Sequence, residues 1–498
     1  MSVARTVRVT SSRCHPVAAA SRRIHGKLQL MILLLLLALT ASAQESTKDI
    51  GEASLEELQK IQVFSASKHL QSTRDAPAAV TVITADEIQK YGFRTLADIL
   101  QSMSGFYITY DRDYSFVGVR GFGRLGDSNN RILVLIDGHR INDNVFGEPY
   151  LGTEFLVDVD LIERVEIIRG PSSSLYGADA FFAVINVITR KPPQLKGVEL
   201  SFAPASFGTY QGRASYGGQY KGIDMLLSGT FYDSQGQTLF FPEFDSPATN
   251  FGITRNTDYE PRLGLIYHLF DPTTLKLLYG TAFRAPEPFE VTPDYGSVYE
   301  NNLQLKPEEI RSDEVIVEQT MGQHFTLTGN LFRNDIDRLI SIETDPGSGQ
   351  LIYRNFGGAV AKGVEIELAG RASNGLQGSA SYSFTHTVGV QPEPVLPNSP
   401  QHLGKLNLIV PVVQQKLFAS LDAQYTSPRQ TLAGNTVSGF SVFNVTLLGH
   451  TLGKHLDVSA SVYNLLDKKY YDPGRPEDVQ DAIQQDGRNF RIKLTGRF

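Results

Sequence analysis

Two stretches of the sequence carry residue types that could do chemistry. The first, Gly121-Phe122-Gly123-Arg124-Leu125-Gly126, matches the G-x-G-x-x-G pattern of dinucleotide-binding loops. That function requires a helix directly after the glycines, so that the helix N-terminus meets the pyrophosphate. Here Asp127–Asn130 and then an apolar, strand-like run follow. We therefore interpret the glycines as a loop rather than a nucleotide site.

The second stretch, Ser172–Ser174, offers three hydroxyl groups, but no G-x-S-x-G elbow surrounds them. No catalytic triad or carboxylate pair assembles elsewhere in the sequence. The ten histidines are scattered, and the one cysteine, Cys14, lies in an N-terminal extension. This excludes a disulfide framework and cysteine metal sites in the processed chain. The sequence thus predicts no enzyme, no metal and no cofactor.

Composition narrows the class of protein further. At 498 residues the chain is too long for one ordinary domain. Its net charge of −7 gives no basic footprint for nucleic acid. The hydrophobic content of 41% is ordinary, which argues against a helical membrane protein.

The N-terminus predicts export. Basic residues between Arg22 and Lys27 precede the apolar run Leu28–Leu39, and Ala41-Ser42-Ala43 follows it. This is the pattern of a signal peptide over residues 1–43, cleaved before Gln44. A membrane anchor is the alternative, but the apolar run is short for a span and small residues follow it. Met31 offers a later start.

The stretch Leu161–Lys191 separates two kinds of sequence. Apolar runs on both sides of Gly170-Pro171 predict a strand, a turn, a helical turn and a second strand. Upstream, Thr84-x-x-Glu87 and Thr95-x-x-Asp98 predict the starts of two short helices in a small α/β unit. Downstream, apolar and polar residues alternate almost to the C-terminus.

Six segments, in their order and spacing, carry a family resemblance. They are Asp75-Ala76-Pro77-Ala78-Ala79-Val80, Val119-Arg120-Gly121-Phe122, Leu135-Ile136-Asp137-Gly138, Ile162–Pro171, Ser174-Leu175-Tyr176-Gly177 and Asn186-Val187-Ile188-Thr189. On these residues the chain resembles the TonB-dependent outer-membrane receptors, in which an N-terminal plug lies inside a C-terminal β-barrel. Ala183 departs from the pattern, since the family usually has Gly there. The resemblance implies a periplasmic leader over 44–74, a plug over 75–191 and a barrel over 192–498.

The leader carries a β-prone segment, Ile61-Gln62-Val63-Phe64-Ser65-Ala66-Ser67. Such a segment can add itself as a strand to the sheet edge of another protein. The resemblance implies that it is the TonB box, on which the energy-transducing protein TonB acts. The alternative is a plain first strand of the plug.

The remaining sequence predicts a mainly β fold, a transmembrane antiparallel barrel. Leu456, Val458 and Val462 alternate with polar residues, so that one face suits lipid and the other water or a polar plug. A soluble β-sandwich also alternates, but it would need no export signal. The last strand ends at Phe498, a terminus of the kind that the barrel assembly machinery reads in outer-membrane proteins.

The barrel is predicted to be incomplete. Residues 192–498 supply only about fourteen strands, whereas barrels that hold a plug have about 22. We place the junction between Phe240 and Asp258, near Ile253-Thr254, where an even number of strands is lost. We expect an open barrel or a poorly paired seam between the strands Ile223–Tyr232 and Tyr259–Leu269.

Two sets of plug residues are candidate sites. An aromatic cluster with one arginine suits a bulky, often anionic chelate, and packing against the barrel is its alternative role. These ligand candidates on the outer plug loops are Tyr107, Tyr110, Arg112, Tyr114, Phe146 and Tyr150. A plug that moves needs hydrated, polar contacts with its barrel. The candidates for those contacts are Glu163, Arg164, Glu166 and Arg169.

The predicted function is active uptake of a scarce bulky nutrient across the outer membrane of a Gram-negative-type bacterium. The resemblance implies a ferric siderophore as ligand, with TonB, outer-membrane lipid and the barrel assembly machinery as partners. Cobalamin or another nutrient, and a shortened paralogue or surface-binding barrel that does not transport, are the alternatives. A signal transducer would need a folded domain before the box, and Gln44–Lys60 is too short for one.

Overall fold

The computed structural model describes residues 62–63, 71–72, 76, 78–235 and 262–498, with short gaps at 113, 124, 126–127, 178, 196, 221–222, 271, 294–298, 356, 391–395, 453–454 and 477. The predicted signal peptide, most of the predicted TonB box and the predicted junction at 240–258 lie outside these residues. Of the box, Gln62–Val63 forms β1, which pairs antiparallel with β2 (Gln71–Ser72).

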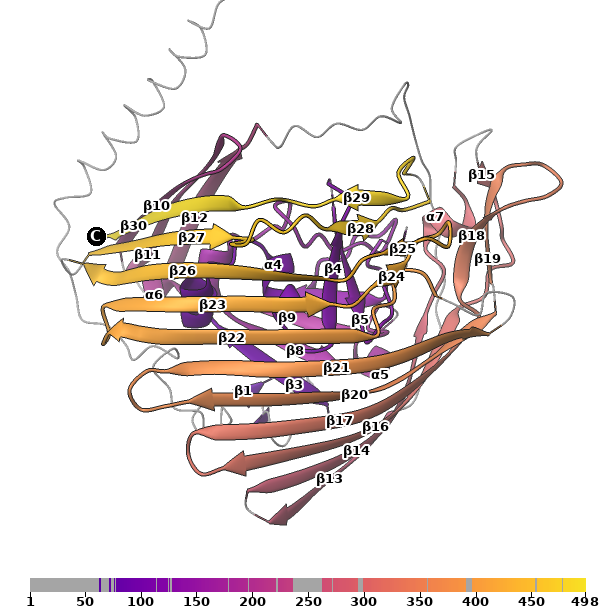
Figure 1. Cartoon of the computed structure of the whole chain (residues 1–498), viewed down its shortest axis with the longest axis horizontal. Coiled ribbons are helices and arrows are strands. Elements are labelled where there is room, and N and C mark those ends of the chain that lie inside the picture. The colour runs from indigo at the N-terminus through magenta and orange to yellow at the C-terminus, as the bar shows by residue number, and fades with distance from the viewer. Residues whose placement is uncertain are drawn as a thin grey trace, which may run out of the picture.

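One antiparallel sheet of fourteen strands forms the wall of the molecule (Figure 1). Neighbouring strands follow the order β12-β11-β10-β30-β27-β26-β23-β22-β21-β20-β17-β16-β14-β13. Their bounds are β10 (Gly197–Ala205), β11 (Thr209–Tyr220), β12 (Ile223–Asp233), β13 (Arg262–Phe270), β14 (Thr273–Arg284), β16 (Glu308–Met321), β17 (Phe325–Asp337), β20 (Gly358–Arg371), β21 (Gln377–Val390), β22 (His402–Val413), β23 (Leu417–Thr426), β26 (Phe440–Leu452), β27 (Leu456–Tyr463) and β30 (Asn489–Arg497). The last strand pairs with the first, since Phe202 lies opposite Leu494.

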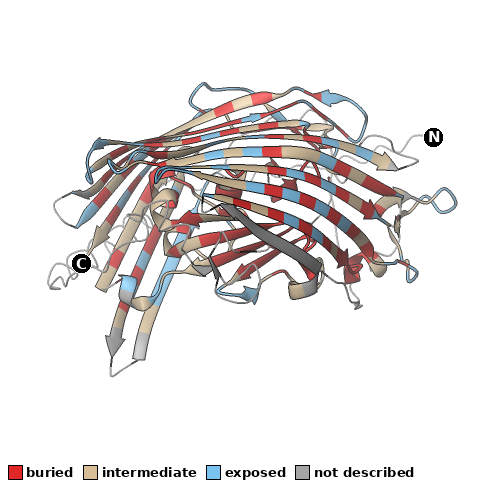
Figure 2. Cartoon of the chain, turned by 90° about the horizontal axis from the view of Figure 1, so that it is seen from below, coloured by how far each residue is buried: buried red, intermediate tan, exposed pale blue. Residues whose placement is uncertain are grey.

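Alternation of residue types gives the wall its two faces. On β17, Leu327 and Leu331 are exposed, whereas Asn330 and Asn334 are buried. The same period of two appears as bands of buried and exposed residues along the strands in Figure 2. An apolar outer face and a polar inner face are the pattern of a barrel that crosses a membrane. The mainly β barrel fold predicted from the sequence is thus confirmed.

The two ends of the wall differ. Short turns join β16 to β17, β20 to β21 and β22 to β23 at one end. Longer links at the other end, here called the outer end, carry small additional elements. These are α7 (Pro288–Val291), β15 (Tyr299–Glu300), β18 (Ile340–Thr344), β19 (Leu351–Asn355), β24 (Arg429–Gln430), β25 (Thr436–Val437), β28 (Tyr471–Pro473) and β29 (Ala482–Gln484).

A small α/β unit lies on the concave side of the wall (Figure 1). Its main sheet has the order β3-β8-β9-β6-β7, and β4 and β5 form a separate hairpin. The bounds are β3 (Ala79–Thr84), α3 (Ala85–Tyr91), α4 (Leu96–Gln101), β4 (Phe106–Tyr110), β5 (Ser115–Val119), β6 (Ile132–Ile136), β7 (His139–Arg140), η3 (Val159–Leu161), β8 (Ile162–Arg169), α5 (Ser173–Tyr176), β9 (Ala183–Thr189) and α6 (Pro192–Leu195). After the glycine-rich loop, the next element in the described residues is the strand β6 and not the helix that a dinucleotide site requires.

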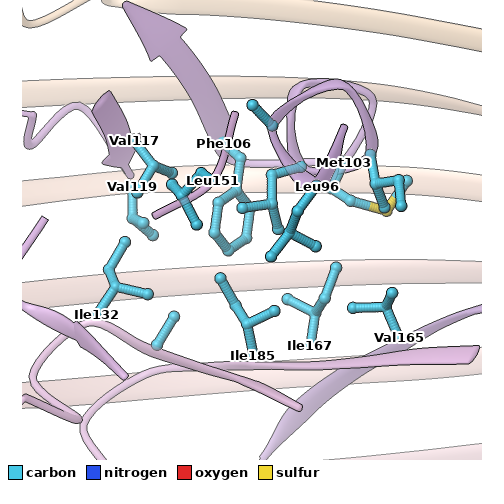
Figure 3. Close-up of a cluster of buried hydrophobic side chains, with 14 of the residues drawn as sticks. Leu96, Met103, Phe106, Val117, Val119, Ile132, Leu151, Val165, Ile167 and Ile185 are labelled. Carbon is cyan, nitrogen blue, oxygen red and sulfur yellow. The ribbon is translucent and has the colours of Figure 1, made fainter. Parts of the chain in front are cut away.

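Local sequence accounts for the plug helices α3 and α4. Thr84 and Glu87 form the predicted capping box of α3, and Gly92 ends that helix with a φ of 71°. The side chain of Thr95 accepts a hydrogen bond from the backbone N–H of Asp98 and so caps α4. The apolar face of α4 packs with Phe106, Ile167 and Ile185 in the plug core (Figure 3).

The wall does not close within the described residues. β12 and β13 are the two ends of the strand order, and no pairing joins them there. Figure 1 shows these strands at opposite limits of the sheet, with the plug between them. The predicted open barrel is therefore confirmed for the described residues. None of the described helices is long and apolar enough to cross a membrane.

Candidate functional site

The plug meets the wall through buried charges. Arg120, which follows β5, donates from Nη2 to Glu314 Oε2 on β16 at 2.8 Å and from Nε to Glu365 Oε1 on β20 at 3.3 Å. The amide of Asn330 on β17 donates to both carboxylates, at 3.1 and 3.3 Å. Because each of these side chains is at most 4% exposed, water screens the ion pairs little.

A second buried network lies nearer the outer end. Glu308 at the start of β16 accepts hydrogen bonds from Arg131 of the plug at 2.5 and 2.7 Å. The Nε of Arg284 on β14 donates to the same carboxylate at 2.9 Å, and Arg284 also forms two bonds with Glu290 of α7. The plug, two wall strands and an outer link are thus held by one charged cluster.

The wall also supplies hydrogen bonds to the C-terminal ends of the plug helices α3 and α4. The backbone oxygens of Lys90, Tyr91 and Gly92 accept hydrogen bonds from Ser420 Oγ, Thr446 Oγ1 and Tyr463 OH at 2.6, 3.0 and 2.6 Å. The last carbonyl groups of α4 accept from Lys405 Nζ at 2.6 Å and from Asn407 Nδ2 at 3.1 Å. Carbonyl groups at a helix end have no partner within the helix, so the wall completes the plug's secondary structure.

Of the four charged residues proposed for plug–barrel contact, Arg169 reaches the wall. Its Nη1 lies 3.4 Å from Glu365 Oε2. Arg164 pairs inside the plug, with Glu163 at 3.0 Å and with Glu166 at 2.9 Å. The sequence reasoning missed Arg120 and Arg131. The sequence does single out Arg131, because a charged residue directly before the apolar strand β6 indicates a buried charge that needs a partner.

A cavity of about 1020 Å³ lies at the outer end between plug and wall. The plug contributes the α3–α4 loop with α4, the end of β4 and the loop 152–158, and the wall contributes parts of β10–β12, β23, β26, β27 and β30. The link after β27, with Tyr470, Asp472 and Asp486, completes the lining. This volume falls at or just above the upper end of the range typical of small-molecule sites.

Tyr110 and Arg112, two of the six ligand candidates, line this cavity. The Nη1 of Arg112 pairs with Asp486 Oδ1 at 2.8 Å, and the guanidinium lies 5.5 Å from the centre of the Tyr110 ring. The backbone N–H of Tyr110 donates to Asp472, whose carboxylate also accepts from Arg429 at 2.6 Å. Ion pairs and hydrogen bonds therefore join the outer links to the plug tip along the lining of the cavity.

The other four candidates lie in three places. Tyr107 is 1% exposed, and its hydroxyl donates to the Asn398 backbone oxygen at 2.7 Å. Tyr114 and Tyr150 are exposed, with ring centroids 6.3 Å apart. Phe146 packs on Phe289 of α7 at 5.0 Å. The structure therefore does not gather the six candidates into one cluster.

Carboxyl groups of the plug loops and outer links have perturbed acidities. Burial, followed by the nearby Asp143 carboxylate, raises the pKa of Glu148 to about 7. Burial, followed by the charge of Asp179, raises the pKa of Glu287 in the link before α7 to about 8. Within the described residues, no group of three or more His, Cys, Asp or Glu side chains is arranged to hold a metal ion.

An α/β plug with an apolar core, capped and charge-paired by a wall of antiparallel strands, defines a plugged β-barrel that is open between β12 and β13 in the described residues. Two family profiles match the sequence. The TonB-dependent Receptor Plug Domain matches residues 72–184, and the TonB dependent receptor-like beta-barrel matches residues 230–465. Together they cover more than half of the chain, which belongs to the TonB-dependent receptor family.

Named relatives match only part of the chain. The Iron-regulated outer membrane virulence protein of Vibrio cholerae is 34% identical over 165 residues, 32% of this chain and 23% of that protein. The Vitamin B12 transporter BtuB of Vibrio vulnificus is 33% identical over 185 residues, 36% of this chain and 29% of that protein. The matched region therefore spans less than a third of these relatives' length.

Solved structures match over most of the chain. The ferripyoverdine receptor of the outer membrane of Pseudomonas aeruginosa has a TM-score of 0.70 at 14% identity, with 92% of this chain and 90% of that chain covered. The ferric yersiniabactin uptake receptor FyuA of Yersinia pestis has a TM-score of 0.64 at 13% identity, with 88% and 100% covered. At such identities the likeness shows the fold alone.

Proposed function

We propose that the chain is an outer-membrane receptor for TonB-driven uptake of a scarce, bulky nutrient, with a ferric siderophore as the first candidate. The observation that carries this proposal is the outer cavity of about 1020 Å³, which the plug tip and the outer links line together. A ligand in this cavity would contact the plug, which must move for transport. The chemistry is binding and gating, not catalysis.

The ligand contacts proposed at this site begin with Tyr110 and Arg112, which line the cavity. Tyr114 and Tyr150 are exposed and form the outermost aromatic pair. Phe146 would act through the aromatic cluster on α7, and Tyr107 through its support of the outer link at Asn398. Aromatic rings of this kind give a large contact area at low entropic cost.

Energy coupling is proposed at Ile61–Ser67. Val63→Pro tests it, because proline cannot donate a ladder hydrogen bond to an added strand. Uptake of a radiolabelled ferric siderophore by whole cells should fall to background, while binding of the same ligand to the cell surface persists. Thr47→Pro, upstream in the polar leader, is the matched control and should transport normally. Normal uptake by Val63→Pro would show that the segment is not the TonB box.

A cobalamin is the second candidate ligand, supported by the 33% identity to a vitamin B12 transporter over 185 residues. Growth of strains with and without the gene on defined iron and cobalamin sources separates the two candidates. Loss of growth on a ferric siderophore alone supports iron uptake. Loss of growth on cobalamin alone supports cobalamin uptake. Normal growth of the strain without the gene on both sources contradicts both candidates.

The open wall motivates a further part of the proposal. We infer that the barrel domain, residues 192–498, lacks a block of strands near residues 240–258, between β12 and β13. Export by the signal peptide 1–43, insertion into outer-membrane lipid and assembly through the strand that ends at Phe498 are proposed with it. Intact mass spectrometry of the protein purified from outer membranes tests the gap. A mass well above that of residues 44–498 would show that strands are missing from the sequence rather than from the protein.

A further inference from the structure

The lining of the outer cavity carries more acidic than basic side chains. Three arginines line it, Arg94, Arg112 and Arg491, together with six carboxylates. The carboxylates are Asp98, Glu154, Asp158, Asp422, Asp472 and Asp486. Lysine and histidine are absent from this lining within the described residues. The distribution bears on the kind of ligand, because a desolvated charge needs an opposite charge or a hydrogen-bonding partner.

Each of the three guanidinium groups is already engaged. Arg94 pairs with Asp98 at 2.9 Å, and Arg112 pairs with Asp486 at 2.8 Å. Arg491 is 7% exposed, and its Nη2 donates to Gln211 Oε1 at 2.9 Å. An anionic ligand would have to break an existing ion pair to reach Arg94 or Arg112, and a hydrogen bond to Gln211 to reach Arg491. The energy of the new pair would then be offset by the loss of the old one.

Not every carboxylate of the cavity lining forms an ion pair with a cation. Asp472 and Asp158 pair with Arg429 and Arg213 at 2.6 and 3.7 Å. Asp422 accepts a hydrogen bond from Asn444 Nδ2 at 2.7 Å and is attracted by the nearby Lys405 ammonium, which itself donates to the Gln101 backbone oxygen. Glu154 accepts a backbone N–H, that of Gly152, at 2.9 Å. In the described part of the chain neither Asp422 nor Glu154 has a cation at ion-pair distance.

We propose that this cavity takes a ligand of neutral or positive net charge, such as a neutral or cationic ferric hydroxamate, and rejects multiply anionic chelates. The inference rests on the proposed uptake function and narrows its substrate class. Glu154 and Asp422 set the sign of the preference. Aromatic rings on the lining, among them Tyr110, Phe155 and Tyr232, add favourable contacts with a cationic or neutral ligand.

The test measures binding to the purified protein, residues 44–498, in detergent at low ionic strength. Three ferric chelates serve as probes: cationic ferrioxamine B, neutral ferrichrome and the triply anionic ferric enterobactin. Cyanocobalamin is a fourth, neutral probe. We expect the tightest of the neutral and cationic probes to bind at least roughly tenfold more tightly than ferric enterobactin. Added salt should reduce this ratio.

Two variants locate the preference. Glu154→Gln keeps a carbonyl acceptor for the N–H of Gly152 but removes the charge. It should weaken binding of ferrioxamine B and strengthen binding of ferric enterobactin by roughly three- to tenfold each. Asp422→Asn should act in the same direction. Glu343→Gln, on the outer hairpin β18–β19 and away from the cavity lining, is the control and should leave both affinities unchanged.

The outcomes of these measurements distinguish failure of the charge preference from failure of the proposed uptake function. Tightest binding of ferric enterobactin, or an unchanged ratio in both charge-removing variants, overturns the charge preference and leaves the uptake proposal intact. If none of the four probes binds, the proposed uptake of siderophore or cobalamin fails, and the charge preference fails with it.

Discussion

The most demanding prediction concerns Glu308, where plug and wall share a buried charge. Glu308→Gln keeps the shape of the side chain but removes the negative charge between Arg131 and Arg284. Glu308 is fully buried, and Arg131 and Arg284 are 4% and 0% exposed, so water cannot replace the carboxylate. Breaking a buried ion pair by removing one partner costs about 3–5 kcal/mol. Arg284 retains Glu290, so we expect the lower part of that range, about 3 kcal/mol.

The assay is urea unfolding of the detergent-solubilised protein, followed by the protease resistance of the plug. Asp337→Asn is the matched control, because its partner Arg311 lies 3.0 Å away and both side chains are more than half exposed. Exposed pairs contribute about 0–1 kcal/mol. If Glu308→Gln costs no more than Asp337→Asn, the cluster is hydrated and the buried-charge reasoning is wrong. Combining Glu308→Gln with Arg131→Gln should cost less than the sum of the single changes.

Three further predictions follow from the plug and its leader. Tyr463→Phe removes the hydroxyl that donates to the Gly92 backbone oxygen; it should cost about 1 kcal/mol and speed hydrogen exchange at the end of α3. Tyr425→Phe, on the exposed face of β23, should change neither quantity. The pKa of Glu148 is raised from 4.5 to about 7. The folded state therefore keeps a proton that the unfolded state loses, and this group lowers stability as pH rises from about 4.5 to about 7. Glu148→Gln should thus stabilise the protein more at pH 8 than at pH 5, whereas equal effects at both pH values would contradict the raised pKa. In cells, Val63→Pro should bind ligand without transporting it, and restored uptake by TonB overproduction would argue for weakened rather than lost coupling.

Local patterns in the sequence were enough for the secondary structure and the fold class. A period of two residues gives a strand one apolar and one polar face whatever its neighbours are, so the wall was predictable from residues such as Leu327 and Asn330. The capping box at Thr84 and the glycine after Tyr91 fixed the limits of α3 in the same way. The number of strands followed from chain length, and with it the open seam between β12 and β13.

The candidate site was predicted less completely. Tyr110 and Arg112 were proposed because an aromatic residue and an arginine near a plug tip suggest a ligand; both line the cavity, and their role in binding stays a prediction. The partner of Arg112, Asp486, lies 374 residues away in the chain, and nothing local in the sequence links the two. The same holds for Arg120 and Arg131, whose carboxylate partners lie on strands of the wall.

The sequence by itself was enough to predict a small α/β unit followed by a mainly β barrel with too few strands to close, and the family resemblance added that the unit is a plug inside the barrel. Periodicity, capping and length are local or additive properties, so they can be read without knowing which residues meet. Only the tertiary structure decided which charges are paired, and hence that Arg112 is neutralised by Asp486 while Glu154 is not. An ion pair depends on distances of a few ångströms between residues hundreds of positions apart, and those distances exist only once the wall has wrapped around the plug.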